Sequence, residues 1–126
     1  MKRIIIVEDD AVVGLVYRTG LMKEGFEVEV AADGEAGLAR ILQICPAAVL
    51  LDLMMPKLPG LEVLKRLRAQ PELSKIPVMV FTNAYVPAMV EEAMKAGATQ
   101  VFNKAVTTPH QVMQALKDAG CFAAEN

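Results

Sequence analysis

The chain has 126 residues, a mass of 13.6 kDa and a formal net charge of -2, with 54% hydrophobic and 22% charged residues. This length fits one domain, and this composition excludes a disordered chain because the apolar side chains suffice for a core. The slightly acidic balance argues against a nucleic-acid or membrane-surface binder, which needs a basic stripe. Cys45, Cys121 and the single histidine, His110, form neither a disulfide framework nor a zinc site.

The first half of the chain alternates short apolar runs with amphipathic stretches. A buried strand is predicted at 4–7, and Asp10 then caps a helix that ends at Gly25. The apolar positions of this helix are Val12, Leu15, Val16 and Met22. Strict alternation over 26–30 predicts a strand with one solvent-facing side, and Asp33 opens a second helix. The apolar positions of the second helix are Leu38, Ile41, Leu42 and Cys45.

The second half continues the same alternation. Strands are predicted at 47–51, 77–81 and 100–103. Helices are predicted at 60–70, at 87–96 with Pro87 in the first turn, and from Thr108-Pro109 onward. Their apolar positions include Leu61, Leu64 and Leu67 in the first of these helices, and Val112, Leu116 and Ala119 in the last. The whole chain, 1–126, is expected to be a single domain, with no output domain in this sequence.

Five strands that alternate with helices predict an α/β fold, a doubly wound parallel sheet with helices on both faces. The strands at 4–7, 47–51 and 77–81 are apolar on both faces and are therefore expected at the centre of the sheet. The other two are expected at its edges. This fits the known flavodoxin-like order 2-1-3-4-5, although the pattern alone leaves the order of the three central strands open.

Polar side chains follow the strands at the edge where ligands bind to a parallel sheet. These residues are Glu8, Asp9 and Asp10 after the first strand, Asp52 after the third, Thr82 after the fourth and Lys104 after the fifth. Carboxylates without a cysteine or histidine cluster suit a hard cation, Mg²⁺ or Mn²⁺. Together with a lysine and a hydroxyl they indicate a phosphate site, and no P-loop is present to bind a nucleotide.

The chemistry that remains for a carboxylate at this edge is nucleophilic, with an aspartyl phosphate as the product. Asp52 is the better nucleophile because it ends a buried central strand. Asp9 suits the metal, and the backbone carbonyl of Met54 is a further candidate ligand. Each residue alone has an ordinary structural explanation, and Asp10 in particular reads as a helix cap.

The segments Val7–Asp10, Leu51–Pro56, Phe81-Thr82 and Val101–Lys104 resemble the receiver domain of two-component response regulators. The resemblance covers essentially the whole chain. It implies that Glu8, Asp9 and Asp52 bind Mg²⁺, with Mn²⁺ as a substitute, and that Asp52 accepts a phosphoryl group from a histidine kinase or phosphotransfer protein.

The resemblance also assigns roles to two other residues. Thr82 matches the switch hydroxyl, and Lys104 matches the lysine that contacts the phosphoryl group. The signal is then expected on the face built by the helix at 87–96, the strand at 100–103 and the last helix. An unknown downstream protein binds there, and a homodimer through this face is a further possibility. The present chain is expected to be cytoplasmic and to be no enzyme beyond its own phosphorylation and slow autodephosphorylation.

Two positions depart from the family pattern. Val101 stands where the family usually has a switch Tyr or Phe, and strand alternation sends Phe102 to the other face. Ala105 stands where the family usually has a proline. We expect phosphoryl acceptance to survive both changes, whereas the usual output is in doubt. Tyr85, Val86 and Val106 are expected near the output face, either as a partner patch or as loop packing.

Three other functions fit parts of this pattern. A degenerate receiver that docks proteins without phosphorylation ranks second, because of Val101 and Ala105. An aspartate-nucleophile phosphatase usually needs a second acid where this chain has Met54. A flavin mononucleotide binder needs a phosphate loop where this chain has acids that repel phosphate.

Overall fold

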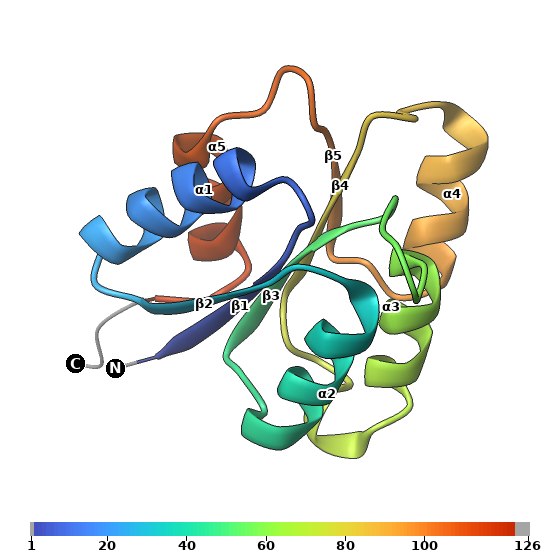
Figure 1. Cartoon of the computed structure of the whole chain (residues 1–126), viewed down its shortest axis with the longest axis horizontal. Coiled ribbons are helices and arrows are strands. Elements are labelled where there is room, and N and C mark those ends of the chain that lie inside the picture. Colours follow the sequence, from blue (N-terminus) through green and yellow to red (C-terminus); the bar gives the residue numbers. More distant parts are fainter. Residues whose placement is uncertain (1, 123–126) are drawn as a thin grey trace.

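The computed structural model describes residues 2–122 of the chain, drawn in Figure 1. The strands are β1 (Arg3–Val7), β2 (Glu27–Ala31), β3 (Ala48–Asp52), β4 (Val78–Thr82) and β5 (Gln100–Asn103). The helices are α1 (Ala11–Lys23), α2 (Gly34–Ile44), α3 (Gly60–Arg68), α4 (Pro87–Lys95) and α5 (Pro109–Asp118). A short 3₁₀ helix at Pro71–Leu73, which the sequence pattern did not predict, precedes β4. The outermost ends of the predicted domain, residues 1 and 123–126, lie outside the described residues.

The five strands form one parallel sheet in the order β2-β1-β3-β4-β5. This confirms the predicted flavodoxin-like architecture, including the edge positions of β2 and β5. Every residue of β3 and β4 is buried, as expected for central strands of a sheet covered on both faces. β3 and β4 each begin and end one residue later than predicted, so that Asp52 and Thr82 are the last residues of their strands.

Helices cover both faces of the sheet, with α1 and α5 on one face and α2, α3 and α4 on the other (Figure 1). Alternate side chains of the central strands pack in two separate hydrophobic clusters, one on each face of the sheet. Val49 and Leu51 pack on the side of α2, α3 and α4, whereas Leu50 packs on the side of α1 and α5. Because the two clusters fix both faces, a register slip of one residue would exchange them, and the strand ends are therefore held in place.

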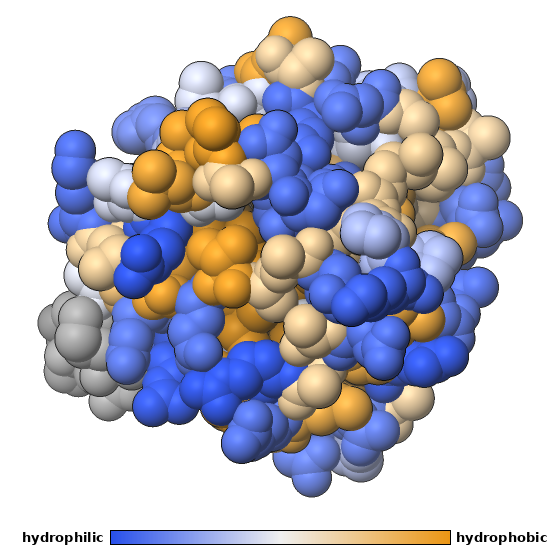
Figure 2. Space-filling view, in the orientation of Figure 1, coloured by the Kyte–Doolittle hydropathy of each residue, from blue (hydrophilic) through white to orange (hydrophobic). Residues whose placement is uncertain are grey.

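The predicted apolar face of α1 is wrong. Val12, Leu15, Val16 and Met22 are 70%, 59%, 48% and 48% exposed. The helix instead buries Gly14, Tyr17 and Leu21. The missing side chain of Gly14 lets α1 approach Val30, to whose Cγ1 an added Cβ would lie only 3.1 Å away. Figure 2 shows the result, with hydrophobic side chains gathered at the surface beside α1 and β2.

Three other positions predicted on apolar helix faces are also exposed, namely Leu42, Cys45 and Ala119. Cys45 and Ala119 are the residues that end α2 and α5, and Cys45 adopts a left-handed backbone with a φ of 47°. Their side chains therefore leave the helical stripe that spacing alone assigns to them. In α5, Met113 and Ala115 complete the buried face with the correctly predicted pair at 112 and 116.

Candidate functional site

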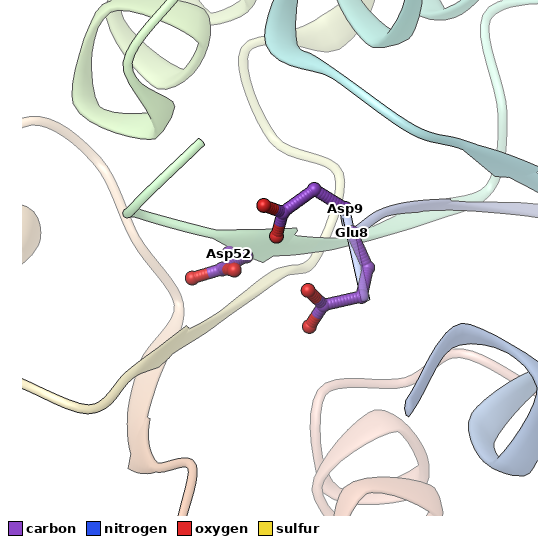
Figure 3. A group of neighbouring side chains, drawn as sticks. All are labelled: Glu8, Asp9 and Asp52. Atoms are coloured by element: carbon purple, nitrogen blue, oxygen red, sulfur yellow. The ribbon is translucent and has the colours of Figure 1, made fainter. Parts of the chain in front are cut away.

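The carboxylates predicted at the carboxyl edge of the sheet do converge. Glu8 and Asp9 follow β1, and Asp52 ends the neighbouring strand β3. One carboxylate oxygen from each of these residues lies within 4.8 Å of the others. Figure 3 shows the three side chains directed into the same space above the strand ends. Parallel pairing of β1 with β3 is sufficient to produce this arrangement, since Val7 pairs with Leu51 one residue before each acid.

Local hydrogen bonds hold the acids in place. Asp10 caps α1 by accepting from the N–H groups of Val12 and Val13 at 2.9 and 3.2 Å, as predicted. Its own N–H donates to Oε2 of Glu8 at 3.1 Å. Asp52 accepts at Oδ1 from the N–H of Met54, also at 3.1 Å. The backbone therefore orients both buried carboxylates before any ligand is present.

The loop that follows Asp52 is folded back on the strand end. Gly60, at the start of α3, donates its N–H to the carbonyl of Leu53 at 3.1 Å. A Cβ added to Gly60 would meet the Asp52 carbonyl and would lie 2.6 Å from the Cα of Leu53. Glycine is thus required here by close backbone approach, and it sets where the loop carrying Met54 leaves the sheet.

Lys104 joins the two buried acids. Its Nζ lies 2.8 Å from Oε1 of Glu8 and 3.0 Å from Oδ2 of Asp52. Glu8 and Asp52 are only 3% and 2% exposed, so this ammonium is their main source of positive charge among the described residues. Asp9, by contrast, is exposed at the rim of the site.

Burial and hydrogen bonding shift the pKa values of Glu8 and Lys104. Burial raises the pKa of Glu8 to about 7, and the hydrogen bonds from Lys104 and Asp10 only partly oppose this rise. Burial alone would lower the pKa of Lys104, but its hydrogen bonds to Glu8 and Asp52 outweigh that effect and the pKa is raised. Lys104 therefore stays charged, while Glu8 is partly protonated near neutral pH.

Thr82 lies beside this centre at the end of β4 and is completely buried. Its Oγ1 accepts from the N–H of Ala84 at 2.9 Å, and its carbonyl accepts from the N–H of Lys104 at 3.0 Å. A hydroxyl carries one proton and accepts up to two hydrogen bonds, so the proton of Thr82 is not used by the Ala84 contact. The residue thus links the loop after β4 to the lysine after β5.

Val101 and Ala105, which depart from the family pattern, lie in β5 and just after it. Val101 is 7% exposed and packs in the cluster on the side of α3 and α4. Phe102 points to the other face, as predicted, where its ring centroid lies 5.8 Å from that of Phe81. The peptide bonds of the described residues are all trans, including the bond between Lys104 and Ala105.

Tyr17 is a site neighbour that sequence reasoning missed. Its hydroxyl donates to the carbonyl of Thr107 at 3.1 Å, which ties α1 to the loop after β5. Burial raises the pKa of Tyr17, and the charge of Glu8 adds to the rise. Tyr17 and Thr107 lie 90 residues apart in the chain, so no local sequence pattern predicts the contact.

The fold and its acidic pocket together define a receiver-type signalling domain. Residues 4–117 match the family model described as the response regulator receiver domain. The chain therefore belongs to the receiver domains of two-component response regulators. Domains of this family are signalling domains rather than classical enzymes, and their acidic residues bind Mg²⁺.

Individual relatives agree with this assignment. The phosphate regulon transcriptional regulatory protein PhoB of Rhizobium meliloti is 29% identical over 109 residues, which cover 86% of this chain and 48% of that protein. The structure of the chemotaxis response regulator CheY4 of Vibrio cholerae matches with a TM-score of 0.87 and 27% identity, covering 94% of this chain and 98% of that one. The BeF3-activated N-terminal receiver domain of Klebsiella pneumoniae RstA matches with a TM-score of 0.84 and 27% identity, covering 93% of this chain and 97% of that one.

The chain spans between about a third and a half of the length of the curated regulators it matches. Among the described residues, no helix has the length and apolar character needed to cross a membrane.

Proposed function

We propose that this domain accepts a phosphoryl group on Asp52 from the phosphohistidine of a histidine kinase or phosphotransfer protein. The observation that carries the proposal is the buried Asp52 carboxylate, bound by Lys104 at 3.0 Å and grouped with Glu8 and Asp9. An isolated structural aspartate at a strand end has no need of a buried lysine and two further acids. This combination is what phosphoryl transfer requires, because positioning and charge neutralisation supply most of the catalysis.

The donor set fits a divalent cation. With all three carboxylates ionised and Lys104 charged, the cluster has two more negative than positive charges, which one Mg²⁺ or Mn²⁺ ion would balance. All the available ligand atoms are oxygens, which these hard cations prefer. Glu8, Asp9 and Asp52 would hold the ion together with the backbone carbonyl of Met54. When bound, the cation neutralises charge on the transferring phosphoryl group.

Asp52, Met54 and Lys104 each have a defined part in the transfer. An oxygen of Asp52 attacks the phosphorus of the phosphohistidine, the phosphorus–nitrogen bond breaks, and its electron pair remains on the imidazole. The Oδ1 atom is already oriented by the N–H of Met54 at 3.1 Å. Lys104 can follow the charge from the carboxylate to the phosphoryl oxygens, since it lies 3.0 Å from Oδ2. The domain catalyses only this step and the slow hydrolysis of its own acyl phosphate.

Thr82 is the proposed relay to the surface. Its free hydroxyl proton can be donated to a phosphoryl oxygen, and the loop after β4 then moves with it. This shift biases an equilibrium between two states of the α4-β5-α5 face. A change from mostly inactive to mostly active takes roughly 5 kcal/mol of differential interaction.

The output partner is proposed to be a protein that binds this face in the cytoplasm, with a homodimer through the same face as a second arrangement. Neither nucleic acid nor membrane is proposed to contact the domain itself. Residues 1–126 are proposed to form one receiver domain.

Intact-mass measurement after incubation with acetyl phosphate tests the proposal. One phosphoryl group per chain is expected with Mg²⁺, none when the metal is chelated, and none in Asp52→Asn. The alternative docking module, which Val101 and Ala105 favour, predicts no adduct under any of these conditions. Continuous release of phosphate from many phosphate esters would instead indicate a phosphatase.

A further inference from the structure

A groove of about 500 Å³ lies between α1 and β2, the strand at one edge of the sheet. Leu15 and Arg18 line it from α1, and the consecutive residues Val28, Glu29 and Val30 line it from β2. Leu15 is 59% exposed and Val30 is 40% exposed, and Figure 2 shows hydrophobic side chains at the surface beside these elements. The groove is therefore partly apolar and follows the outer edge of a strand.

The backbone of β2 directs hydrogen-bonding groups into this groove. The N–H of Glu27 and the carbonyl of Ala31 are both hydrogen-bonded toward β1, each at 2.9 Å. In a parallel ladder, the residues that alternate with these face away from the neighbouring strand. Val28 and Val30 therefore point their N–H and C=O groups outward. Among the described residues, the Val28 carbonyl alone of these groups has a partner, because Nε of Arg18 donates to it at 3.4 Å.

The side chains around these backbone groups suit a further strand. Val28 and Val30 pair with residues of β1 that pack on the side of α1 and α5, so their own side chains lie on that side as well. An extended segment added along β2 would place every second side chain there, beside Val28, Val30 and Leu15. Backbone hydrogen bonds and apolar contacts would then act together.

The two ends of the groove carry opposite charges. Arg18 lies at the end near Val28, whose carbonyl it contacts. The exposed Asp9 lines the other end, together with Ala32, which follows the last residue of β2. Electrostatic complementarity therefore favours a segment with an acid beside Arg18, a base beside Asp9 and apolar residues between them.

A second copy of this chain fits the same edge less well. The sequence of β2 is Glu-Val-Glu-Val-Ala, so pairing with β2 of another copy would bring Glu27 and Glu29 close to the same acids of that copy. Like charges directly opposite each other destabilise a pair of strands. This charge pattern favours a segment of a different protein.

We propose that the α1–β2 groove binds an extended segment of a partner protein, which adds a strand to the sheet beside β2. The segment carries two apolar side chains at alternate positions, with an acid at one end and a base at the other on the same side. β2 and β5 are the opposite edges of the sheet, so a segment bound here leaves the α4-β5-α5 face free. The inference goes beyond the proposed function and does not require phosphorylation of Asp52.

Amide hydrogen exchange of the full chain, followed by NMR, tests the proposal with two synthetic heptapeptides. One has the sequence Glu-Thr-Val-Thr-Val-Thr-Lys with both ends blocked, and the other has the reverse order. The two orders distinguish parallel from antiparallel addition, and a chelator in the buffer keeps Asp9 free of metal. With one of these peptides at saturation, the amides of Val28 and Val30 are expected to exchange about tenfold more slowly. The amides of Glu29 and Ala31 already face β1 and should change little.

Three results would overturn the proposal. Neither peptide order protects Val28 and Val30, so that no strand is added. All four amides of 28–31 are protected equally, so that the peptide stabilises the domain without pairing with β2. The amides of Val28 and Val30 are protected without peptide and increasingly with protein concentration, so that a second copy occupies the edge.

Leu15→Lys and Val12→Lys form a matched pair of variants. Both side chains are apolar and exposed on α1, at 59% and 70%, but only Leu15 lines the groove. Leu15→Lys should weaken binding of the peptide about tenfold, because it removes an apolar contact, whereas Val12→Lys should leave the affinity unchanged. Val30→Pro removes an outward N–H without loss of a ladder bond and should also weaken binding. Unchanged affinity in both Leu15→Lys and Val30→Pro would contradict binding in this groove.

Discussion

Replacement of Glu8 by Gln should stabilise the metal-free domain at alkaline pH. Glu8 is 3% exposed and accepts hydrogen bonds from Lys104 and from the N–H of Asp10. Its pKa is raised from the ordinary 4.5 to about 7, with burial as the largest cause. The folded chain therefore keeps a proton that the unfolded chain has already lost, and the free energy of unfolding falls as the pH rises between these two values.

The magnitude follows from the change in pKa. A rise from 4.5 to about 7 corresponds to about 3 kcal/mol of unfolding free energy. The full contribution is present below pH 4.5 and is lost once the pH has passed 7. Gln carries no charge at any pH and still offers an oxygen to Lys104. Glu8→Gln should therefore match the parent near pH 4 and exceed it by about 2–3 kcal/mol near pH 8.

Urea unfolding in the presence of a chelator, followed by circular dichroism across this pH range, measures the difference. Mg²⁺ should remove much of the fall in the parent, because a bound cation takes the place of the proton. Glu29→Gln is the matched control. The hydrogen bond from Arg40 lowers the pKa of Glu29, so this half-buried acid should contribute in the opposite direction. A difference between Glu8→Gln and the parent that stays constant with pH would refute the reasoning.

Three further substitutions test the geometry of the strand ends. Asp10→Ala removes the cap of α1 and should cost about 1 kcal/mol in urea unfolding without preventing phosphorylation, so a loss of the adduct would contradict its purely structural role. Gly60→Ala places a Cβ 2.6 Å from the Cα of Leu53 and should cost roughly 3 kcal/mol or more, whereas Gly14→Ala meets the Val30 side chain at 3.1 Å and should cost less; equal effects on the melting temperature would contradict the packing at β3. Lys104→Met leaves two buried acids without their ammonium and should cost about 3 kcal/mol at alkaline pH and less at acidic pH, so a loss independent of pH would show that proton uptake does not compensate.

The sheet and its functional edge follow from local patterns in the sequence. The runs at 4–7, 47–51 and 77–81 are apolar throughout, and such runs fit only central strands between two layers of helices. Once the strands are parallel and neighbours, the acids that end β1 and β3 must meet. Lys104 is placed at the same edge by the end of β5, and its Nζ lies 3.0 Å from Oδ2 of Asp52.

The buried face of α1 could not be predicted in the same way. Apolar residues occur on most sides of this helix, so helical spacing alone selects no face. The choice is made by close approach at two glycines, Gly14 against Val30 and Gly20 against Pro109. Both contacts join residues far apart in the chain, and the exposure of Leu15 at 59% is their consequence.

The finer electrostatics of the site were also beyond the sequence. The raised pKa of Glu8 depends on how completely its own side chain is buried, and the sequence records only that an acid is present. The hydrogen bond from Tyr17 to Thr107 depends on how α1 lies against the loop after β5. Packing between separate segments decides both features.

The most direct measurement for the central claim is the location of the phosphoryl group. Borohydride converts an aspartyl phosphate to homoserine, which tandem mass spectrometry of peptides assigns to a single position. After incubation with a phosphohistidine donor protein and Mg²⁺, homoserine is predicted at position 52 and at no other aspartate, including Asp9 and Asp10. Homoserine at another acid, or its absence when the donor has lost its phosphoryl group to the domain, would contradict Asp52 as the acceptor.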